Sequence, residues 1–552
     1  MRGSTGIDSW VVGNASRASV WRRREEKIHR QARVLAALEK VVERLAERGR
    51  LQEAMIAAEA AAHVAWWYHP GRFHSARLER ILIAAGDALP RIGIRRTIAA
   101  RQRRVLHVVS VASGAGGHRS LLTRWIRRDR SRRHDLFVSR PCGVDRRLRE
   151  VVAISGGVIW EVERWLAPLE RAAALRRAAS GAELVVLHTH PDDAVPLVAL
   201  GTVDRPPVLF VNHADHCFWL GRAIADVVCC LRHSATELAV KRRRIPRRRI
   251  EVLPLPIEPP GDPTHLDRRR ARRALGVPDA KPLVVTVASE WKLVPVAGLP
   301  SSAQLALRLA ERVPELHMLF VGPRPTHPVF SSLAASTAGR VRALGETERV
   351  AELFAGADLY VDSAPVASLT SLLEAVAAGL PAVSMRLGRG EAGVVWSDHP
   401  WLEGELPVAE DEAAWREKVI HLVTDPQERE NLSRRLTEMV SAHADGEWLE
   451  VLERIYSKTH ECGSRVAQAS GEESPEEPVG CETVDLLLAA VQMGRDTPVT
   501  KRMRNLIKGS TWTYRWPATA AASLLGAVGR IPRFGLRLQS ELEEALDRLL
   551  AG

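Results

Sequence analysis

The distribution of apolar residues changes character near residue 104. Beyond it, short continuous apolar runs such as "VLHVV", "ELVVLHTH" and "PVLFVNH" alternate with stretches in which apolar residues recur at every third or fourth position. Strands in continuous apolar runs, separated by helices, indicate a parallel sheet with both faces covered. The segment "EPPGDPTHLDRRRARR" interrupts this pattern, and a second series then begins with "PLVVTVAS", "HMLFVG" and "ADLYVDS". The chain therefore predicts two consecutive Rossmann-like, doubly wound α/β domains at residues 101–264 and 265–458.

The regions on either side of these domains have other patterns. Within residues 1–100, apolar residues recur at three- and four-residue spacing from residue 22 onward, with breaks at Gly49 and at Pro70-Gly71. This spacing predicts one or two antiparallel helical hairpins of the tetratricopeptide type, without the strict repeat of a longer array. Residues 459–482 are rich in Gly, Ser, Glu and Pro, which predicts a flexible linker, and residues 483–552 are expected to form a helical tail.

Composition narrows the class of protein. A chain of 552 residues with 46% hydrophobic residues can build several cores. Its net charge is +13, but the excess is Arg spread along the whole chain, and no motif that reads nucleic acid is present, so we expect no nucleic-acid partner. The six cysteines have neither CxxC nor metal-ligand spacing and are typical of reduced thiols in a cytoplasmic protein. We expect neither a signal peptide nor a membrane span.

The segment "SAPVASLTSLLEAVAAGLPAVS" (363–384) carries the clearest chemical signal. It follows a predicted strand and continues into a helix, so the start of this helix lies where ligands bind in open α/β sheets. Unpaired amides and the helix dipole favour a negatively charged group there. Three hydroxyl residues add donors suited to a diphosphate: Ser368, Thr370 and Ser371. Glu374, on the same helix face as Thr370, is placed to accept both hydroxyls of a ribose. Ser371 and Glu374 also fit a capping box, which needs no ligand.

The helix motif "LLEAVAAGLPAVS" resembles the "LLEAxAxGxPVV" pattern of GT-B glycosyltransferases of family 4, where it binds the nucleotide diphosphate of a sugar donor. The resemblance covers residues 104–458 and implies the GT-B architecture of two Rossmann-like domains. Family 4 usually has a second Glu eight residues before the helix Glu, in contact with the transferred sugar, but here that position is Val366. The hydroxyl-rich loop is instead similar to the phosphate loop of O-GlcNAc-type transferases, which also carry helical repeats in front of GT-B domains.

The resemblance implies further donor contacts. Lys292, after the first strand of the second domain, matches a phosphate-binding Lys of the family, although a lone Lys after a strand is also commonly solvated. Arg324 and His327 follow another strand and are weaker candidates. In the first domain, Gly116 and Gly117 resemble the loop whose bare backbone approaches the donor, or else form a tight turn without a ligand. The dinucleotide fingerprint is missing from this turn, which argues against an NAD enzyme.

Candidate catalytic residues follow another strand of the first domain. The segment "VLFVNHADHCFWLG" places His213, Asp215 and His216 at one strand end. The family has a His here that contacts the transferred sugar, and one of these side chains is a candidate base for the acceptor hydroxyl. The polar segment "HTHPDD" (188–193) also ends a strand and ranks lower, because His and Asp are common in turns.

Together these features predict a cytoplasmic, hexosyltransferase-type enzyme that transfers a sugar from a nucleotide-diphosphate donor to an acceptor hydroxyl without a metal or other cofactor. The acceptor would be a glycan, a lipid-linked molecule or a protein, in the synthesis of envelope polysaccharide or another glycoconjugate. Two alternatives remain open. One is a GT-B nucleotide-sugar epimerase, which forms product from the donor alone. The other is a degenerate, non-catalytic GT-B binding module.

Clusters of basic residues suggest one more partner. Residues 241–250 and 268–273 are rich in Arg, and residues 501–517 combine cations with Trp and Tyr. Such segments favour peripheral contact with an anionic membrane at its inner face. An Arg-rich surface that is simply solvated is the alternative.

Overall fold

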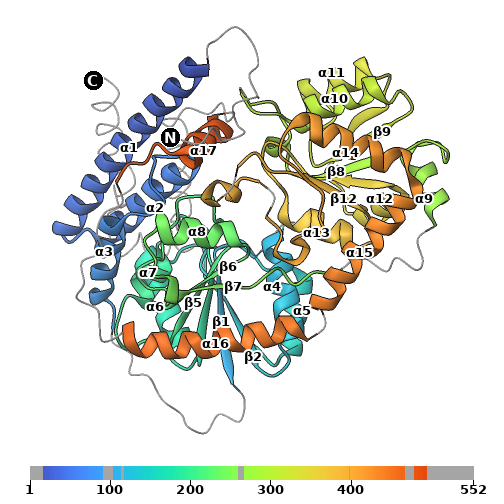
Figure 1. Cartoon of the computed structure of the whole chain (residues 1–552). Helices are drawn as coiled ribbons and strands as arrows, with labels where there is room; N and C mark the ends of the chain where they lie inside the picture. The colour runs from blue at the N-terminus through green and yellow to red at the C-terminus, as the bar shows by residue number, and fades with distance from the viewer. Residues whose placement is uncertain are drawn as a thin grey trace, which may run out of the picture.

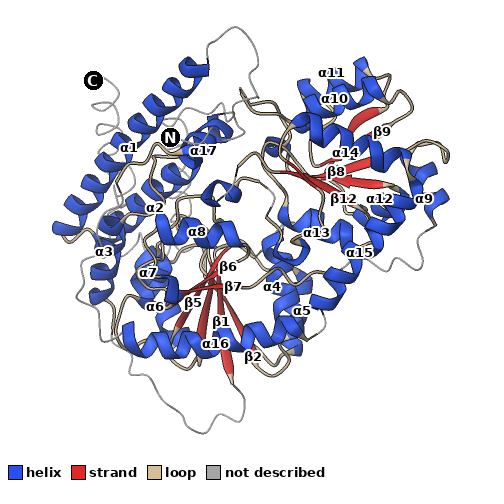
Figure 2. Ribbon diagram, in the orientation of Figure 1, coloured by secondary structure: helices blue, strands red, loops and turns tan. Residues whose placement is uncertain are grey.

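The computed structural model describes residues 17–90, 103–112, 117–258, 267–296, 298–388, 390–396, 398–444, 446–466 and 478–493. It contains two parallel sheets, each with helices on both of its faces (Figures 1 and 2). This arrangement confirms the two doubly wound α/β domains predicted from the alternation of apolar runs and helical segments. Gly116 and residues 501–517 lie outside the described residues.

The first sheet has seven parallel strands in the order β3-β2-β1-β4-β5-β6-β7. Its strands are β1 (Arg104–Val109), β2 (Arg133–Val138), β3 (Ile159–Glu161), β4 (Leu184–His188), β5 (Val208–Asn212), β6 (Val227–Cys230) and β7 (Ile250–Val252). Its helices are α4 (Gly117–Arg128), α5 (Arg146–Ile154), α6 (Pro168–Ala179), α7 (Val195–Leu200) and α8 (His233–Lys241). Because the strand order reverses between β1 and β4, this point of the carboxyl edge is a switch point where ligands bind in such sheets.

The second sheet repeats this order with six parallel strands, β10-β9-β8-β11-β12-β13. Its strands are β8 (Leu283–Val287), β9 (His317–Val321), β10 (Val341–Gly345), β11 (Leu359–Val361), β12 (Ala382–Met385) and β13 (Val408–Ala409). Its helices are α9 (Arg268–Leu275), α10 (Ser302–Arg312), α11 (Pro328–Ser336), α12 (Val350–Gly356), α13 (Leu369–Ala377), α14 (Glu412–Thr424) and α15 (Pro426–Ala444). Three short helices lie in its loops: η5 (Glu290–Lys292), η6 (Gly390–Val394) and η7 (Pro400–Leu402). The switch point lies between β8 and β11.

The N-terminal region is a helical hairpin, as predicted. Helices α1 (Arg17–Glu47) and α2 (Leu51–Trp67) pack together around a turn in which Gly49 has a φ of +69°. They are followed by α3 (Ala76–Ala85) and η2 (Gly86–Ala88). The carboxylate of Glu79 in α3 accepts hydrogen bonds from three consecutive backbone amides, at residues 221–223. These three hydrogen bonds fix the helical region to the first α/β domain.

The last described helices differ from the predicted domain boundaries. Helix α16 (Glu447–Val466) continues past residue 458 and packs against β5 and β6 of the first sheet. Its Trp448 indole donates to the Pro254 carbonyl over 3.0 Å, and Lys458 pairs with Glu251. The linker prediction is therefore wrong for residues 459–466, because an amphipathic helix finds an apolar face to cover. Beyond the segment at 467–477, which lies outside the described residues, α17 (Thr483–Met493) packs against α1.

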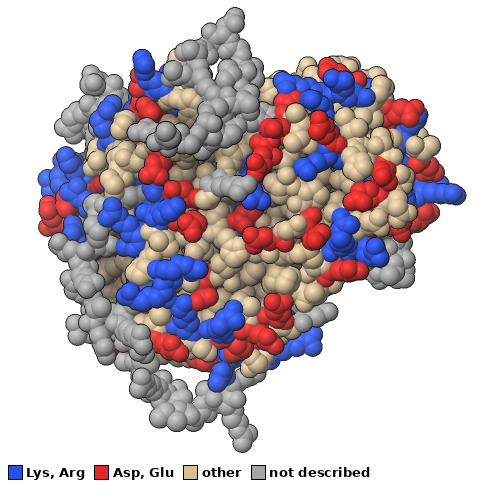
Figure 3. Space-filling model, viewed as in Figure 1, with Lys and Arg blue, Asp and Glu red and all other residues tan. Residues whose placement is uncertain are grey.

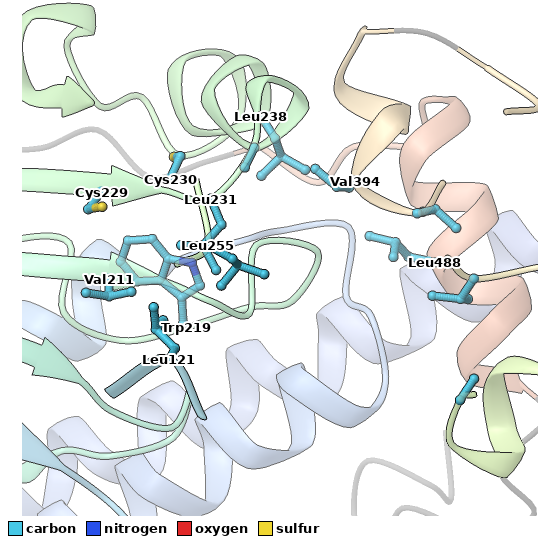
Figure 4. Packing of buried hydrophobic residues seen from close by; sticks show 14 of the residues in the cluster. Leu121, Val211, Trp219, Cys229, Cys230, Leu231, Leu238, Leu255, Val394 and Leu488 are labelled. Atoms are coloured by element: carbon cyan, nitrogen blue, oxygen red, sulfur yellow. The ribbon is translucent and has the colours of Figure 1, made fainter. Parts of the chain in front are cut away.

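The junction between the domains shares a hydrophobic core. Leu238 of α8, Val394 of η6 and Leu488 of α17 belong to one buried cluster (Figure 4). The carboxylate of Asp485 in α17 is buried and binds His69 and Arg242, each over 2.8 Å. Segments far apart in sequence are thus held together at this junction. None of the described helices has the length and apolar character that a membrane span needs.

Three buried histidines form a hydrogen-bonded row on one face of the first sheet. Nε2 of His107 lies 2.9 Å from Nδ1 of His134. Nδ1 of His107 lies 3.0 Å from Nε2 of His188. Nε2 of His134 lies 2.7 Å from the Asp129 carbonyl, which can only accept, so this nitrogen carries a hydrogen. In a neutral ring the other nitrogen, Nδ1 of His134, must then accept from Nε2 of His107. Nδ1 of His107 in turn accepts from Nε2 of His188, so each ring carries its hydrogen on Nε2. Burial lowers the pKa of all three imidazoles, that of His188 to about 3.

Candidate active site

The loop after β11 is organised by a buried carboxylate. Asp362 follows the strand directly, and its side chain accepts hydrogen bonds of 2.8 Å from the backbone amides of Ser363 and Ser368 and from the Ser384 hydroxyl. The hydroxyl of Ser368 is turned inward and lies 2.9 Å from that of Ser363. This loop brings the chain from the carboxyl end of β11, at the switch point, to the first turn of α13.

Helix α13 begins at Leu369, with Ser368 as its N-cap residue. The Ser368 side chain caps none of the first-turn amides, and Ser371 lies inside the helix, so the predicted capping box is not formed. Thr370 and Ser371 are partly exposed in this first turn. The helix ends as predicted, because Gly379 has a φ of +86° and lets Leu380 donate to the Ala375 carbonyl over 3.0 Å. The positive end of the helix dipole is therefore available to an anion.

Lys292 lies on the opposite side of the same switch point. It belongs to η5, after β8, and its ammonium group donates to the Ala367 carbonyl in the loop before α13 over 2.9 Å. Burial lowers the pKa of Lys292 to about 8, against the opposing effect of Asp362. The structure thus places a buried cation beside the first turn of α13, near the carboxylate of Asp362.

Glu374 is engaged by the first domain. Its carboxylate accepts a hydrogen bond of 2.6 Å from the guanidinium of Arg124 in α4, and both side chains are largely buried. Arg124 also donates to the Pro256 carbonyl over 3.5 Å. The residue expected to hold a ribose therefore forms an ion pair between the two domains.

A second group of contacts joins the two domains. Arg232, after β6, binds both carboxylate oxygens of Asp215 over 2.6 and 2.8 Å. The same guanidinium donates to the carbonyls of Val394 and Trp396 in the second domain, over 2.6 and 3.2 Å. Because both Asp215 and Arg232 influence the protonation of Lys292, the candidate residues of the two domains lie close together.

The three predicted catalytic residues have different charges at neutral pH. Arg232 outweighs burial and holds the pKa of Asp215 well below its usual range, which makes this carboxylate a poor base. Burial lowers the pKa of His213 to about 4, so its imidazole is neutral. Burial opposes protonation of His216 as well, but Cys217 and Asp215 raise its pKa to about 9. Of the three, neutral His213 fits the role of a base best, and cationic His216 can donate a hydrogen bond.

Comparison with known proteins finds a family model that matches most of the second domain. Residues 282–425 match the family model described as "Glycosyl transferases group 1". This part of the chain is similar to the group 1 family of glycosyl transferases. It contains Lys292, the loop after β11 and the whole of α13, and it confirms the resemblance seen in the motif "LLEAVAAGLPAVS". No curated protein matched the chain.

The chain is also similar to solved structures, and the likeness to the first of the three below supports the GT-B fold. An O-GlcNAc transferase from Thermobaculum terrenum is 16% identical, with a TM-score of 0.50 over 79% of this chain and 83% of that one. A glycosyltransferase from Rickettsia africae is 12% identical, with a TM-score of 0.49 over 66% and 99% of the two chains. Anabaena HepE, solved with UDP and glucose, is 15% identical, with a TM-score of 0.48 over 64% and 98%.

The other predicted site residues that the structure describes make no hydrogen bond or ion pair with Lys292 or the first turn of α13. Gly117 is the first residue of α4, and Val366 is buried in the loop between β11 and α13. Arg324 is exposed and pairs with Glu290 over 3.0 Å. His327 caps α11 through a hydrogen bond from the Val329 amide. These last two side chains have structural partners outside the loop that precedes α13.

Sequence reasoning missed three charged residues of the site, which are Arg124, Arg232 and Asp362. Asp362 directly follows the apolar strand β11, and Arg232 lies just after β6. The rule that ligands bind at the carboxyl ends of parallel strands could therefore have found both. Arg124 gave no comparable signal, because it lies in the second turn of a helix.

Several arginines of the two basic runs are buried and have partners inside the protein. Lys and Arg are interspersed with Asp and Glu on the visible face (Figure 3). In the run at 241–250, Arg242 binds Asp485, and Arg243 donates to the carbonyls of three residues, while Arg244, Arg247 and Arg248 are exposed. In the run at 268–273, Arg272 pairs with Asp358. Contact with an anionic membrane stays a prediction that now rests on the exposed cations.

Proposed function

We propose that this protein transfers a sugar from a nucleotide-diphosphate donor to an acceptor hydroxyl. The observation that carries the proposal is the first turn of α13, which has no side-chain cap and lies beside Lys292 at the switch point of a domain similar to the group 1 family. Helix amides, the Thr370 and Ser371 hydroxyls and one ammonium group together suit the charge of a diphosphate. The acceptor enters from the first domain, where neutral His213 receives the proton of its hydroxyl.

A turnover assay tests this proposal. The full chain is incubated with UDP-, GDP- and ADP-linked hexoses, with and without a mixture of saccharides, lipid-linked sugars and proteins as acceptors. We expect release of the nucleoside diphosphate from one donor, with faster release when a suitable acceptor is present. Conversion of the donor to an isomeric nucleotide sugar without acceptor would make the protein an epimerase. Binding without any turnover would indicate a non-catalytic module.

Glu374 tests the position of the ribose. The Glu374→Gln variant should bind a nucleoside diphosphate about 10-fold more weakly, because a hydrogen bond to a charged group contributes roughly 1.5 kcal/mol or more. Binding of inorganic pyrophosphate should not change, because it has no ribose. Calorimetric titration with both compounds measures the two affinities.

The matched control for this prediction is Arg124→Ala, which removes the partner of Glu374 but keeps the carboxylate. It should weaken the contact between the two domains without the selective loss of nucleotide over pyrophosphate. Equal losses for both compounds in Glu374→Gln would mean that the carboxylate acts only through its ion pair with Arg124, and the ribose assignment would be wrong.

We also propose that the reaction needs neither a metal nor another cofactor. Within the described part of the chain, no group of three His, Cys, Asp or Glu side chains has the geometry of a metal site. The proposed diphosphate contacts are Lys292, helix amides and hydroxyls. Turnover should therefore be unchanged within about twofold after treatment with EDTA, because these groups already supply positive potential. Complete loss of turnover that Mg²⁺ or Mn²⁺ restores would refute metal independence.

A further inference from the structure

We propose that His399 is a positioning residue of the donor site. When a diphosphate binds at the first turn of α13, His399 takes up a proton from the solvent and pairs with Asp362. The inference rests on the proposed function, because it concerns the loop that leads into the same helix. It adds to that site a histidine for which neither the sequence motif nor the residue spacing gives a signal.

His399 lies between β12 and η7, directly before Pro400. Its side chain is 1% exposed, and its Nε2 lies 3.7 Å from Oδ2 of Asp362, whose side chain is also 1% exposed. This distance is too long for a hydrogen bond, but it is within the range of an ion pair once the imidazole is charged. The imidazole thus lies next to the carboxylate that organises the loop before α13.

The buried imidazole of His399 lacks hydrogen-bond partners. Among the described residues, neither its Nδ1 nor its Nε2 has such a partner, although both atoms are buried. A neutral ring has one N–H donor and one acceptor nitrogen, and a buried group left unpaired costs about 1–3 kcal/mol. A folded protein retains such a group for a reason, and a ligand that changes the charge of the ring supplies one.

The backbone around His399 is held on both sides by the first domain. The Asp398 carboxylate accepts a hydrogen bond of 2.5 Å from the Ser234 amide in α8. On the other side, the Trp401 indole donates to the Leu255 carbonyl over 3.1 Å. These two contacts keep the imidazole beside Asp362, so that a change in its charge acts on that carboxylate.

Asp362 connects His399 with the proposed diphosphate site. Its Oδ1 accepts a hydrogen bond of 2.8 Å from the amide of Ser368, which is the N-cap residue of α13. In the same loop, the Ala367 carbonyl accepts a hydrogen bond from Lys292. An ion pair between His399 and Asp362 would therefore fix the loop that presents the first turn of α13 to the phosphates.

The charges around this loop favour proton uptake when a diphosphate arrives. Arg232 is paired with Asp215 through two hydrogen bonds, and Lys292 interacts with Asp362. A bound diphosphate adds several negative charges to groups that already balance one another. Negative charge nearby favours the protonated form of an imidazole, so the added phosphates shift His399 toward the imidazolium that Asp362 can bind.

The other titratable groups of the site do not supply this proton uptake at neutral pH. Its neighbours raise the pKa of His216 to about 9 against the effect of burial, so His216 already carries its proton. Burial lowers the pKa of His213 to about 4, so that ring stays neutral. Burial also lowers the pKa of Lys292 to about 8, but at pH 7 it is still about nine-tenths charged. Histidine changes charge between about pH 5 and 8, which leaves His399 as the group that can respond.

Isothermal titration calorimetry of the full chain at pH 7.0 counts the protons. Binding of UDP or GDP is measured in several buffers that differ in their enthalpy of ionisation. The wild type should take up roughly 0.5 proton more per bound nucleotide than His399→Asn or His399→Gln. Protonation of the nucleotide itself cancels in this difference. His421→Asn is the matched control, because His421 is an exposed histidine of the same domain, and it should take up as many protons as the wild type.

Nitrogen-15 NMR of the histidine-labelled wild-type chain gives a second readout that does not depend on the folding of the variants. One imidazole should change from the neutral to the cationic pattern of shifts when the nucleotide is added. Nucleotide binding without such a change, or proton uptake that both His399 variants retain, would overturn the inference and leave the proposed function intact. Absence of binding of either nucleotide to the wild type would count against the proposed function, and the inference would fall with it.

Discussion

The Lys292→Ala variant should bind a nucleoside diphosphate about 10- to 100-fold more weakly, because a hydrogen bond to a charged group contributes about 1.5–3 kcal/mol. The cation lies at the switch point beside the first turn of α13, and its present acceptor is a carbonyl, that of Ala367. A diphosphate would be a stronger partner for it than this neutral oxygen. Calorimetry measures the affinity, and turnover should fall at least as much.

Lys281→Ala is the matched control, because Lys281 is a partly exposed lysine of the same domain that pairs with Glu315. Its nucleotide affinity should equal that of the wild type. The pH dependence gives a second check. Since burial lowers the pKa of Lys292 to about 8, its charge is lost as the pH rises through 8, and nucleotide affinity should fall over that range in the wild type. Equal affinities for the wild type and Lys292→Ala would remove Lys292 from the site.

The first sheet should lose stability steeply as the pH falls from 7 to 5. His107, His134 and His188 are neutral in the folded protein, because burial lowers the pKa of each below its ordinary value of 6.5. The unfolded chain takes up protons below pH 6.5, whereas the folded chain does not. The stabilisation is therefore fully present above pH 6.5 and is lost as the pH falls toward the folded-state values. For His188, with a folded pKa of about 3, the loss at pH 5 is about 2 kcal/mol.

Hydrogen exchange of the amides in β1 and β4 measures this effect in the full chain. After correction for the intrinsic pH dependence of exchange, the free energy of opening should fall by about 2 kcal/mol or more between pH 7 and pH 5, because about 2 kcal/mol is the loss expected for His188 alone. Replacement of exposed His421 by Ala should leave this slope unchanged, whereas His188→Leu should make it shallower. A free energy of opening that stays constant over this range would mean that the three imidazoles take up protons in the folded state as readily as in the unfolded chain.

Much of the fold follows from local patterns in the sequence. Continuous apolar runs predict the strands of both sheets except β13, and a helical spacing broken at Gly49 predicts the α1–α2 hairpin. Helix α13 and its end at Gly379 also follow from one short segment, because a helix after a strand, its first-turn residues and its stop signal are all local features.

The remaining features depend on contacts between residues far apart in the chain. Three side-chain pairs join segments whose spacing carries no pattern: Arg124–Glu374, Arg232–Asp215, and His63 of α2 with Asp192 in the loop after β4. Ser368 was expected to face a phosphate, but Asp362 binds its amide and the hydroxyl turns toward Ser363. Likewise, the charge pattern of α16 shows that one face is apolar but not which domain that face will cover.

The central claim is that α13 and Lys292 hold the diphosphate of a sugar donor. A crystal structure of the full chain with a nucleoside diphosphate, UDP or GDP, tests it most directly. We predict phosphate oxygens within hydrogen-bond distance of the Thr370 and Ser371 amides and of the Lys292 ammonium group, with the ribose hydroxyls on Glu374. Phosphates bound elsewhere, with the first turn of α13 unchanged and Lys292 still on the Ala367 carbonyl, would contradict the account.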